Sequence, residues 1–454
     1  MRVTTIDHYL PEPGTFVWWA PESAATESVP SPVAPSFNQR VHLASAERGS
    51  TWLAGSFEVE GAIDHAALEL AYRGLIDRHG SLRSSFVSTV RGPSRRRYPT
   101  PRLRRQDGVR ADTATQLRDL LRQAFTERCR PFGFPAYLLG AIDRPERSTI
   151  ICGFDHAHVD SYSIAIVIED MRRLYQGFRS ETLPKTGDFV DFCAEQAAVA
   201  PTLDDQRLHE WHRFFGTRAS PPTFPLDLGL APGTKAPQAS DLRQVLDAAA
   251  VERFETLCRG QGSGVFAGCL AAMAESVRSL GGGDRTRVLF PMHTRHHDAW
   301  RHAVGWFTSD APIEVDTDAD PATAIRRTGR GVRAGIELGT LPLEHVVAAL
   351  GGLDLVRDDI FMMSYIDYRR LPGATHHHAV RAQHISNVSA ADDAQFWLSR
   401  TADGLALRSR YPDTAEAHSV IAGFLDEFQH TLLRFGAASH GVTGAARRGL
   451  TLLA

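Results

Sequence analysis

Apolar positions recur along this chain with two periods. A spacing of three to four residues, which puts side chains on one face of a helix, predicts helices at 66–78, 113–128, 163–178, 248–259, 265–280 and 416–435. Short apolar runs and two-residue alternation predict strands at 52–59, 84–90, 137–142, 148–154, 288–291, 311–315, 359–366, 395–400 and 405–411. Because strands and helices mix without strict alternation, we predict an α/β protein with mixed sheets.

Several residues mark the ends of these elements. Asp64 directly precedes the first predicted helix and is a good N-cap. The segment 219–237 is rich in proline and predicts a connector between packed elements. The segment 279–284 predicts a loop.

Size and composition narrow the class of protein. The 454 residues amount to about three times a common domain, so two or three packed units are expected. The formal charge of −3 includes no basic excess, which argues against a nucleic-acid partner. No apolar run is long enough to span a membrane, and the first residues have no apolar stretch typical of a secretory signal. The five cysteines are odd in number and lack CxxC spacing, which favours reduced thiols in the cytoplasm.

One basic run departs from this even charge distribution. It covers Arg91–Arg97 and continues at Arg102, Arg104 and Arg105. We interpret it as a solvated loop. The alternative is a docking surface for an acidic partner, such as a carrier protein or a coenzyme phosphate.

The segment 150–163 carries the candidate chemistry. An apolar strand runs into His156, and Asp160 follows four residues later, just before a predicted helix. This order places an imidazole at the open end of a strand, where it could take a proton from a hydroxyl or an amine. The HxxxD spacing is common by chance, so by itself it fits a structural histidine at least as well.

A metal site is an alternative interpretation of the same segment. His156, His158 and Asp160 begin like the HxHxDH signature of metallo-hydrolases, in which alternate histidines bind a metal. Ser161 stands where that signature has its third histidine. Ligands from elsewhere could come from His293, His296, His297 and the run His376–His378, although their spacing matches no common metal site.

The order of several short motifs resembles the condensation domains of nonribosomal peptide synthetases. Arg78–Phe86 is similar to the RHxxLRxxF segment of that family, and Asp155–Ser161 is similar to its HHxxxDG motif. Arg295 with Val304–Ser309 resembles the R…VGxFxN element. Further similarities lie at Pro222–Asp227, Ser364–Arg369 and Arg408–Pro412, so the resemblance covers about residues 36–430. Free-standing members, including polyketide-associated acyltransferases, are the most similar.

The resemblance implies a fold and a set of roles. The implied fold is α/β, with two chloramphenicol-acetyltransferase-like lobes in a V-shaped pseudo-dimer and the active site at the cleft. The lobes would be residues 1–185, which carry the HxxxD motif, and residues 186–454. His156 would be the catalytic base. Asp160 would hold the loop, with Arg295 as its partner, and backbone N–H groups after His156 would stabilise the oxyanion, aided by Ser161.

Some positions support the site or depart from the family pattern. Gly305 belongs to the VGxFxN element, and Trp306 beside it is expected to pack at the lobe junction. Asp155 replaces the first histidine of HHxxxDG, which is regarded as structural. Ser161 replaces the motif glycine and would be strained if this position needs a positive φ. Ser309 stands where the family often has asparagine.

The resemblance also implies an activity. The chain would be a stand-alone acyltransferase that moves an acyl or aminoacyl group to a hydroxyl or an amine of a natural-product or lipid acceptor, as in antibiotic biosynthesis. The donor would be a phosphopantetheine thioester on a carrier protein or on coenzyme A, with no bound cofactor and no metal. Two alternatives remain. One is a non-catalytic recruitment protein with the same fold, and the other is the metallo-hydrolase.

Overall fold

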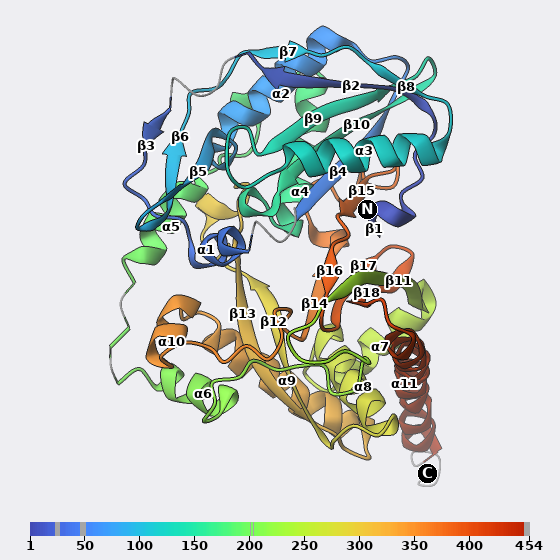
Figure 1. Cartoon of the computed structure of the whole chain (residues 1–454). Coiled ribbons are helices and arrows are strands. Elements are labelled where there is room, and N and C mark those ends of the chain that lie inside the picture. The colour runs from blue at the N-terminus through green and yellow to red at the C-terminus, as the bar shows by residue number, and fades with distance from the viewer. Residues whose placement is uncertain (23–27, 46–50, 200, 203, 449–454) are drawn as a thin grey trace. The chain divides into compact units, whose positions relative to one another are not determined.

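The computed structural model describes residues 1–22, 28–45, 51–199, 201–202 and 204–448 (Figure 1). The chain forms two compact units, each built from three segments of the sequence. The first comprises Met1–Ala200, His293–Thr308 and Tyr368–Ser389, and the second comprises Pro201–Met292, Ser309–Asp367 and Ala390–Ala454. The predicted lobes 1–185 and 186–454 divide the chain at one point only, and they stay a prediction.

The first unit contains a large mixed sheet and a small one. Its helices are α1 (Phe37–Ala44), α2 (His65–Arg78), α3 (Ala114–Arg128), α4 (Ser161–Tyr175) and α5 (Phe189–Ala197). Its strands are β1 (Arg2–Thr5), β2 (Gly14–Pro21), β3 (Val29–Pro30), β4 (Trp52–Glu60), β5 (Ser84–Thr89), β6 (Gly92–Arg97), β7 (Leu103–Arg105), β8 (Val109–Ala111), β9 (Tyr137–Asp143), β10 (Arg147–Asp155) and β15 (Gln383–Ser386). The large sheet has the order β1-β15-β4-β10-β9-β2-β7, with β8 also paired to β2.

Strand β10 lies in the middle of this sheet and is covered on both faces. It pairs antiparallel with β4 and β9. Ile150, Cys152 and Phe154 point to the side covered by α2 and α4, whereas Ile151 packs on the side of α3 (Figure 1). Alternate side chains of a strand face opposite ways, so a continuous apolar run is what a strand buried on both faces requires.

The basic run proves to be ordered, which corrects the prediction of a solvated loop. Residues 92–97 form β6, which pairs with β5 as a hairpin. Arg95 is only 1% exposed, because alternation along the strand turns it inward. Its guanidinium donates to the Gln39 side chain at 2.8 Å, and Arg97 pairs with Asp188. The run therefore contributes one internal cation, Arg95, as well as a charged surface.

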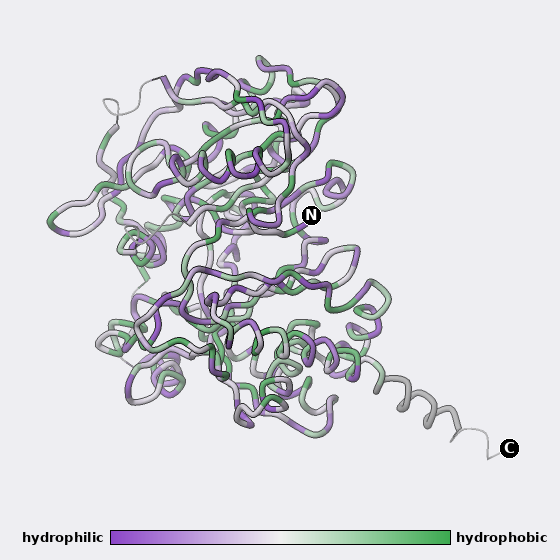
Figure 2. The backbone as a smooth tube through the Cα atoms, turned by 45° about the vertical axis from the view of Figure 1, so that its right-hand side comes forward, coloured by the Kyte–Doolittle hydropathy of each residue, from purple (hydrophilic) through white to green (hydrophobic). Residues whose placement is uncertain are grey.

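The second unit is built around a sheet of order β13-β12-β14-β17-β18-β11-β16. These strands are β11 (Ala236–Asp247), β12 (Arg285–His293), β13 (Thr308–Asp316), β14 (Met362–Asp367), β16 (Ala390–Ala391), β17 (Gln395–Thr401) and β18 (Gly404–Pro412). Its helices are α6 (Gln206–Phe215), α7 (Ala248–Gly260), α8 (Val265–Ser279), α9 (Pro321–Leu338), α10 (Leu343–Ala349) and α11 (Ala415–Arg448). Residues of α7, α8 and α11 share one apolar core with the sheet. Hydrophobic and hydrophilic residues are interspersed along the helices (Figure 2).

Most predicted elements are present, with ends that differ by a few residues. Asp64 caps α2 as expected, accepting from the N–H groups of Ala66 and Ala67. Several elements were not predicted, among them β2, α1, α5, α6, β11, α9, α10 and β15. Within the described ranges, no helix is both long and apolar enough to cross a membrane. All five cysteines are buried and free of disulfides.

Candidate functional site

The candidate site begins where β10 ends. The strand runs to Asp155 and passes directly into a short 3-10 turn, η4 (His156–His158), after which α4 starts at Ser161. Asp160 is the N-cap of α4, and its carboxylate accepts from the Ser163 N–H at 2.7 Å. An aspartate in this position satisfies a backbone donor that the first helical turn leaves unpaired. The strand–turn–helix order therefore follows from the local sequence.

His156 lies against the indole of Trp306. The two ring centroids are 4.0 Å apart, with 32° between the planes. The Nδ1 atom of His156 is buried and has no hydrogen-bond partner among the residues that the structure describes. Of the two ring nitrogens, this leaves Nε2 as the candidate proton acceptor. Packing against Trp306 restricts the ring, in place of the carboxylate that orients the histidine of a serine-protease triad.

The environment of His156 favours its neutral form. Burial lowers the pKa of its imidazole below the ordinary value, and the charge of His42 lowers it further. The His156 backbone carbonyl and the carboxylates of Asp155 and Asp160 act in the opposite direction. A histidine that is neutral at physiological pH is able to accept a proton.

The turn η4 is fastened to helix α1 through the peptide groups of Ala157. Asp155 Oδ1 accepts from the Ala157 N–H at 2.9 Å and from His42 Nε2 at 3.0 Å. The Ala157 carbonyl accepts from the side chain of Gln39 at 2.7 Å, and Gln39 in turn accepts from the buried Arg95. The backbone on either side of Ala157 is thus fixed by side chains from β10 and α1.

Asp160 and Arg295 form a buried, bidentate ion pair, as predicted. Arg295 Nη1 lies 2.7 Å from Asp160 Oδ2, and Nη2 lies 3.0 Å from Oδ1. The guanidinium is sandwiched between Tyr162 and Phe307, whose ring centroids lie 4.6 Å and 4.4 Å from its central carbon. Burial tends to raise the pKa of Asp160. The charge and hydrogen bonds of Arg295, helped by Ser163, outweigh burial and hold that pKa below its usual range.

Ser163 and Gly305 complete this cluster. The Ser163 hydroxyl accepts from Arg295 Nη2 at 2.9 Å and from the Gly305 N–H at 3.1 Å, and donates to the Gly305 carbonyl at 2.9 Å. A Cβ on Gly305 would lie 2.3 Å from the ring of Phe189, so the close approach of the chain there requires glycine. The VGxFxN element therefore anchors α4.

The structure brings six of the seven predicted site residues into the first unit. These are Asp155, His156, Asp160, Ser161, Arg295 and Gly305. Ser309 belongs to the second unit, where it begins the segment Ser309–Asp367, and it is buried in β13. Ser161 is the first residue of α4 and is unstrained, because the described non-glycine residues with positive φ are Ala219 and Arg381.

The suggested oxyanion donors are in part already engaged. The Ala157 N–H donates to Asp155, and the Val159 N–H donates to the His156 carbonyl at 3.4 Å. These two groups after His156 are therefore not free to bind a substrate oxyanion. The Ser161 hydroxyl, in the first turn of α4, stays a candidate donor.

Sequence reasoning missed His42, Gln39 and Ser163, and it interpreted Trp306 as a junction residue. The His42–Asp155 hydrogen bond joins residues 113 positions apart, and no local pattern signals such a contact. Ser163 had a signal, because it stands three residues after the N-cap Asp160. The Trp306 ring lies on His156 and, edge-on, 5.8 Å from His42.

His158 of the alternative metal motif makes contacts within the protein core. His158 Nδ1 hydrogen-bonds the carbonyl of Ser81 at 2.8 Å, and its ring packs on Phe86. Burial lowers the pKa of His158 to about 4. Throughout the part of the chain that the structure describes, no group of three or more His, Cys, Asp or Glu side chains is arranged to hold a metal ion.

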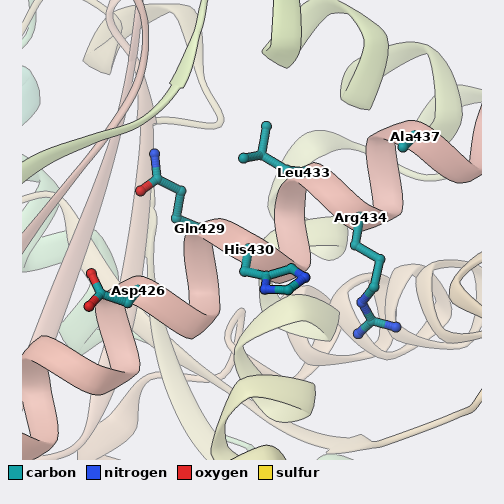
Figure 3. A pocket seen from close by; sticks show the side chains of 6 residues that line it. All are labelled: Asp426, Gln429, His430, Leu433, Arg434 and Ala437. Carbon is teal, nitrogen blue, oxygen red and sulfur yellow. The ribbon is translucent and has the colours of Figure 1, made fainter.

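The second unit carries a separate surface groove along α11 (Figure 3). Its lining side chains all project from that one helix: Asp426, Gln429, His430, Leu433, Arg434 and Ala437. None of the predicted site residues is among them.

Comparison with known proteins shows the family to which the chain belongs. The family described as "Condensation domain" matches residues 38–434. Acyltransferase PapA3 of Mycobacterium tuberculosis is 24% identical, over 94% of each chain. Trehalose-2-sulfate acyltransferase PapA2 of Mycobacterium tuberculosis is 23% identical, over 95% of this chain and 97% of that protein. The solved structure of PapA2 acyl transferase has a TM-score of 0.87 at 22% identity and covers 96% of this chain and 100% of its own. The predicted α/β fold of the condensation-domain type is confirmed.

Proposed function

Because the chain belongs to the condensation-domain family and is an acyltransferase, we propose that it transfers an acyl group from a phosphopantetheine thioester to a hydroxyl of a small-molecule acceptor. The donor thioester would be carried by an acyl or peptidyl carrier protein or by coenzyme A. An aminoacyl donor and an amine acceptor fit the same chemistry, since one base serves both nucleophiles. A hydroxyl is preferred because the relative named for trehalose-2-sulfate acts, by its name, on a sugar.

In the proposed reaction, His156 Nε2 takes the proton of the acceptor hydroxyl as its oxygen attacks the thioester carbonyl. A carbon–oxygen bond forms and the carbon–sulfur bond breaks. The thiolate leaves with the proton returned by His156, so the base is regenerated. Asp160 takes no proton, because Arg295 stabilises its charged form, and it serves to hold the start of α4.

The observation that carries this proposal is the state of His156. The residue is half-buried at the end of a rigid strand, its Nδ1 is buried, and its pKa is lowered. A neutral, oriented imidazole with one nitrogen left to accept a proton is what general-base catalysis requires. The replacement of the first motif histidine by Asp155 leaves this arrangement intact, since Asp155 is paired with His42.

The developing negative charge on the thioester oxygen needs a donor. The Ser161 hydroxyl is the group that we propose for it, because the N–H groups of Ala157 and Val159 are engaged. Its position in the first turn of α4 adds the favourable end of the helix dipole.

Intact-mass measurement of acyl transfer tests the proposal. Carrier proteins and coenzyme A, loaded with a panel of acyl and aminoacyl groups, would be offered simple alcohols, sugars and amines. We expect product with the unchanged protein and a loss of about 10²–10⁴-fold or more with His156→Ala. His65→Ala is the matched control, because His65 pairs with Asp143 at the opposite end of β9 from the site.

Each outcome separates the possible functions. Equal turnover by both proteins would remove His156 from its proposed role. Binding of loaded carriers without turnover by either protein would favour a non-catalytic recruitment protein. Activity that a chelator abolishes and Zn²⁺ restores would favour the metallo-hydrolase.

A further inference from the structure

Helix α1 presents two polar side chains to the turn η4, which contains His156. Gln39 and His42 are three residues apart and so share one face of the helix. Gln39 is fully buried, and the side chain of His42 is 8% exposed. Each reaches η4, Gln39 at the carbonyl of Ala157 and His42 at Asp155. On the inward face of α1, two buried positions are therefore occupied by polar side chains in place of apolar ones.

Asp155 shows why His42 is needed there. Its side chain is 0% exposed, and a charge buried in this way requires a compensating partner. Oδ1 receives the hydrogen bonds from His42 and Ala157, while Oδ2 is buried with no partner among the residues that the structure describes. The side chain of His42 is therefore the partner that compensates this carboxylate.

We propose that His42 is a positioning residue for His156: it neutralises Asp155, which fixes the Ala157 peptide, and it places a positive charge beside the His156 ring. The rings of His42 and His156 have centroids 6.3 Å apart, with Trp306 packed against both. The meaning of this arrangement for catalysis rests on the function proposed for His156.

The charges around His156 predict the direction in which loss of His42 should shift the pKa of His156. His42 lowers the pKa of the His156 ring, whereas Asp155 and Asp160 raise it, and Asp160 is itself paired with Arg295. His42 is faced by Asp155, His156 and the edge of Trp306, and its charge also lowers the pKa of His158. Loss of the His42 charge alone should therefore make His156 easier to protonate.

NMR titration of histidine-labelled full-length protein measures this directly and needs no substrate. The His156 signal would be assigned from its loss in His156→Asn. We expect His42→Gln to raise the pKa of His156 by about 0.5–2 pH units, the range for a unit charge about 6 Å away at effective dielectrics of 80 and 20. His42→Lys keeps a cation beside Asp155 and should leave the pKa of His156 close to its starting value.

Two further variants separate electrostatics from loosened packing. Asp155→Asn removes the negative charge, so it should not raise the pKa of His156. His65→Gln breaks a partly exposed pair with Asp143, remote from the site, and should change nothing at His156. His42→Asn replaces His42→Gln if the latter does not fold by circular dichroism.

The proposal is overturned if His42→Gln leaves the pKa of His156 unchanged or lowers it, or if His42→Lys raises it equally. Its failure is distinct from failure of the proposed function. If His156→Ala keeps full transfer activity while His42→Gln still raises the pKa, the function is wrong and the electrostatic arrangement stands. If both hold, the acid limb of kcat/KM should move to higher pH in His42→Gln by the same amount.

Discussion

Asp160 in the first unit and Asp393 in the second are both buried carboxylates, yet their charge states differ. Asp160 is paired with Arg295, and its pKa lies below the usual range. Asp393 accepts backbone N–H groups, from Phe224 at 3.1 and 3.2 Å and from Ala394 at 2.8 Å. Burial raises the pKa of Asp393 to about 7, and these N–H groups offset burial only in part.

The difference shows what keeps a buried carboxylate ionised in this fold. Two parallel hydrogen bonds from a guanidinium stabilise an anion where amide dipoles alone do not. It also gives the two carboxylates opposite contributions to the pH dependence of stability. Asp160, with a lowered pKa, stabilises the folded state above its unfolded pKa near 4, and this stabilisation is lost as the pH falls. Asp393, with a raised pKa, weakens folding progressively as the pH rises from about 4 to about 7.

Removal of Arg295 should have the largest effect on stability, because Arg295 is the cation that distinguishes Asp160 from Asp393. We expect Arg295→Met to lower the free energy of unfolding by about 3–5 kcal/mol, since Asp160 is left buried without a cation. Urea denaturation checks this. Arg301→Met is the control, because its pair with Asp298 is exposed and should contribute about 1 kcal/mol or less. Similar losses in both variants would contradict our account of Asp160.

Asp393→Asn should have the next largest effect, with the opposite sign. The neutral amide avoids burial of a charge, so at pH 8 the variant should be more stable than the unchanged protein by up to about 4 kcal/mol. Near pH 4 the two should agree, because Asp393 is then protonated. Thermal unfolding from pH 4 to 8 measures both. The exposed Asp403→Asn is the control. A variant less stable at pH 8 would show that Asp393 is needed as an anion.

Ser163→Ala should have the smallest effect and sharpens the account of the first unit. It removes the hydroxyl that bridges Arg295 and Gly305 but leaves the Asp160–Arg295 pair in place. We expect a loss of about 1–3 kcal/mol in the free energy of unfolding by urea. Ser161→Ala, two positions earlier, should change stability by about 0.5 kcal/mol or less. A loss as large as that of Arg295→Met would place the hydroxyl, and not the ion pair, at the centre of the cluster.

The strand–turn–helix unit that carries the site could be predicted from local sequence. The apolar run of β10 and the N-cap Asp160 both act over a few residues. Helix α1 could not be predicted in the same way. It is eight residues long and buries Gln39 and His42 beside Leu43, so its inward face has no clean apolar period.

The motifs placed His156, Asp160, Arg295 and Gly305 by their order in a family, and the pairing of Asp160 with Arg295 followed from that resemblance. The roles of Arg95 and Trp306 needed the structure. Arg95 looked like surface charge because composition does not reveal which side of a strand faces the core, and the hairpin turns it inward. Trp306 reaches His156 from a segment of the chain about 150 residues away.

The sequence by itself determined the local geometry of the site: a buried strand, a sharp turn at His156 and a capped helix, because periodicity and capping act between neighbouring residues. Only the tertiary structure decided the charge states. The pKa of an imidazole or a carboxylate depends on burial and on charges a few ångströms away, and these come from residues such as His42 and Arg295, more than a hundred positions distant in the chain.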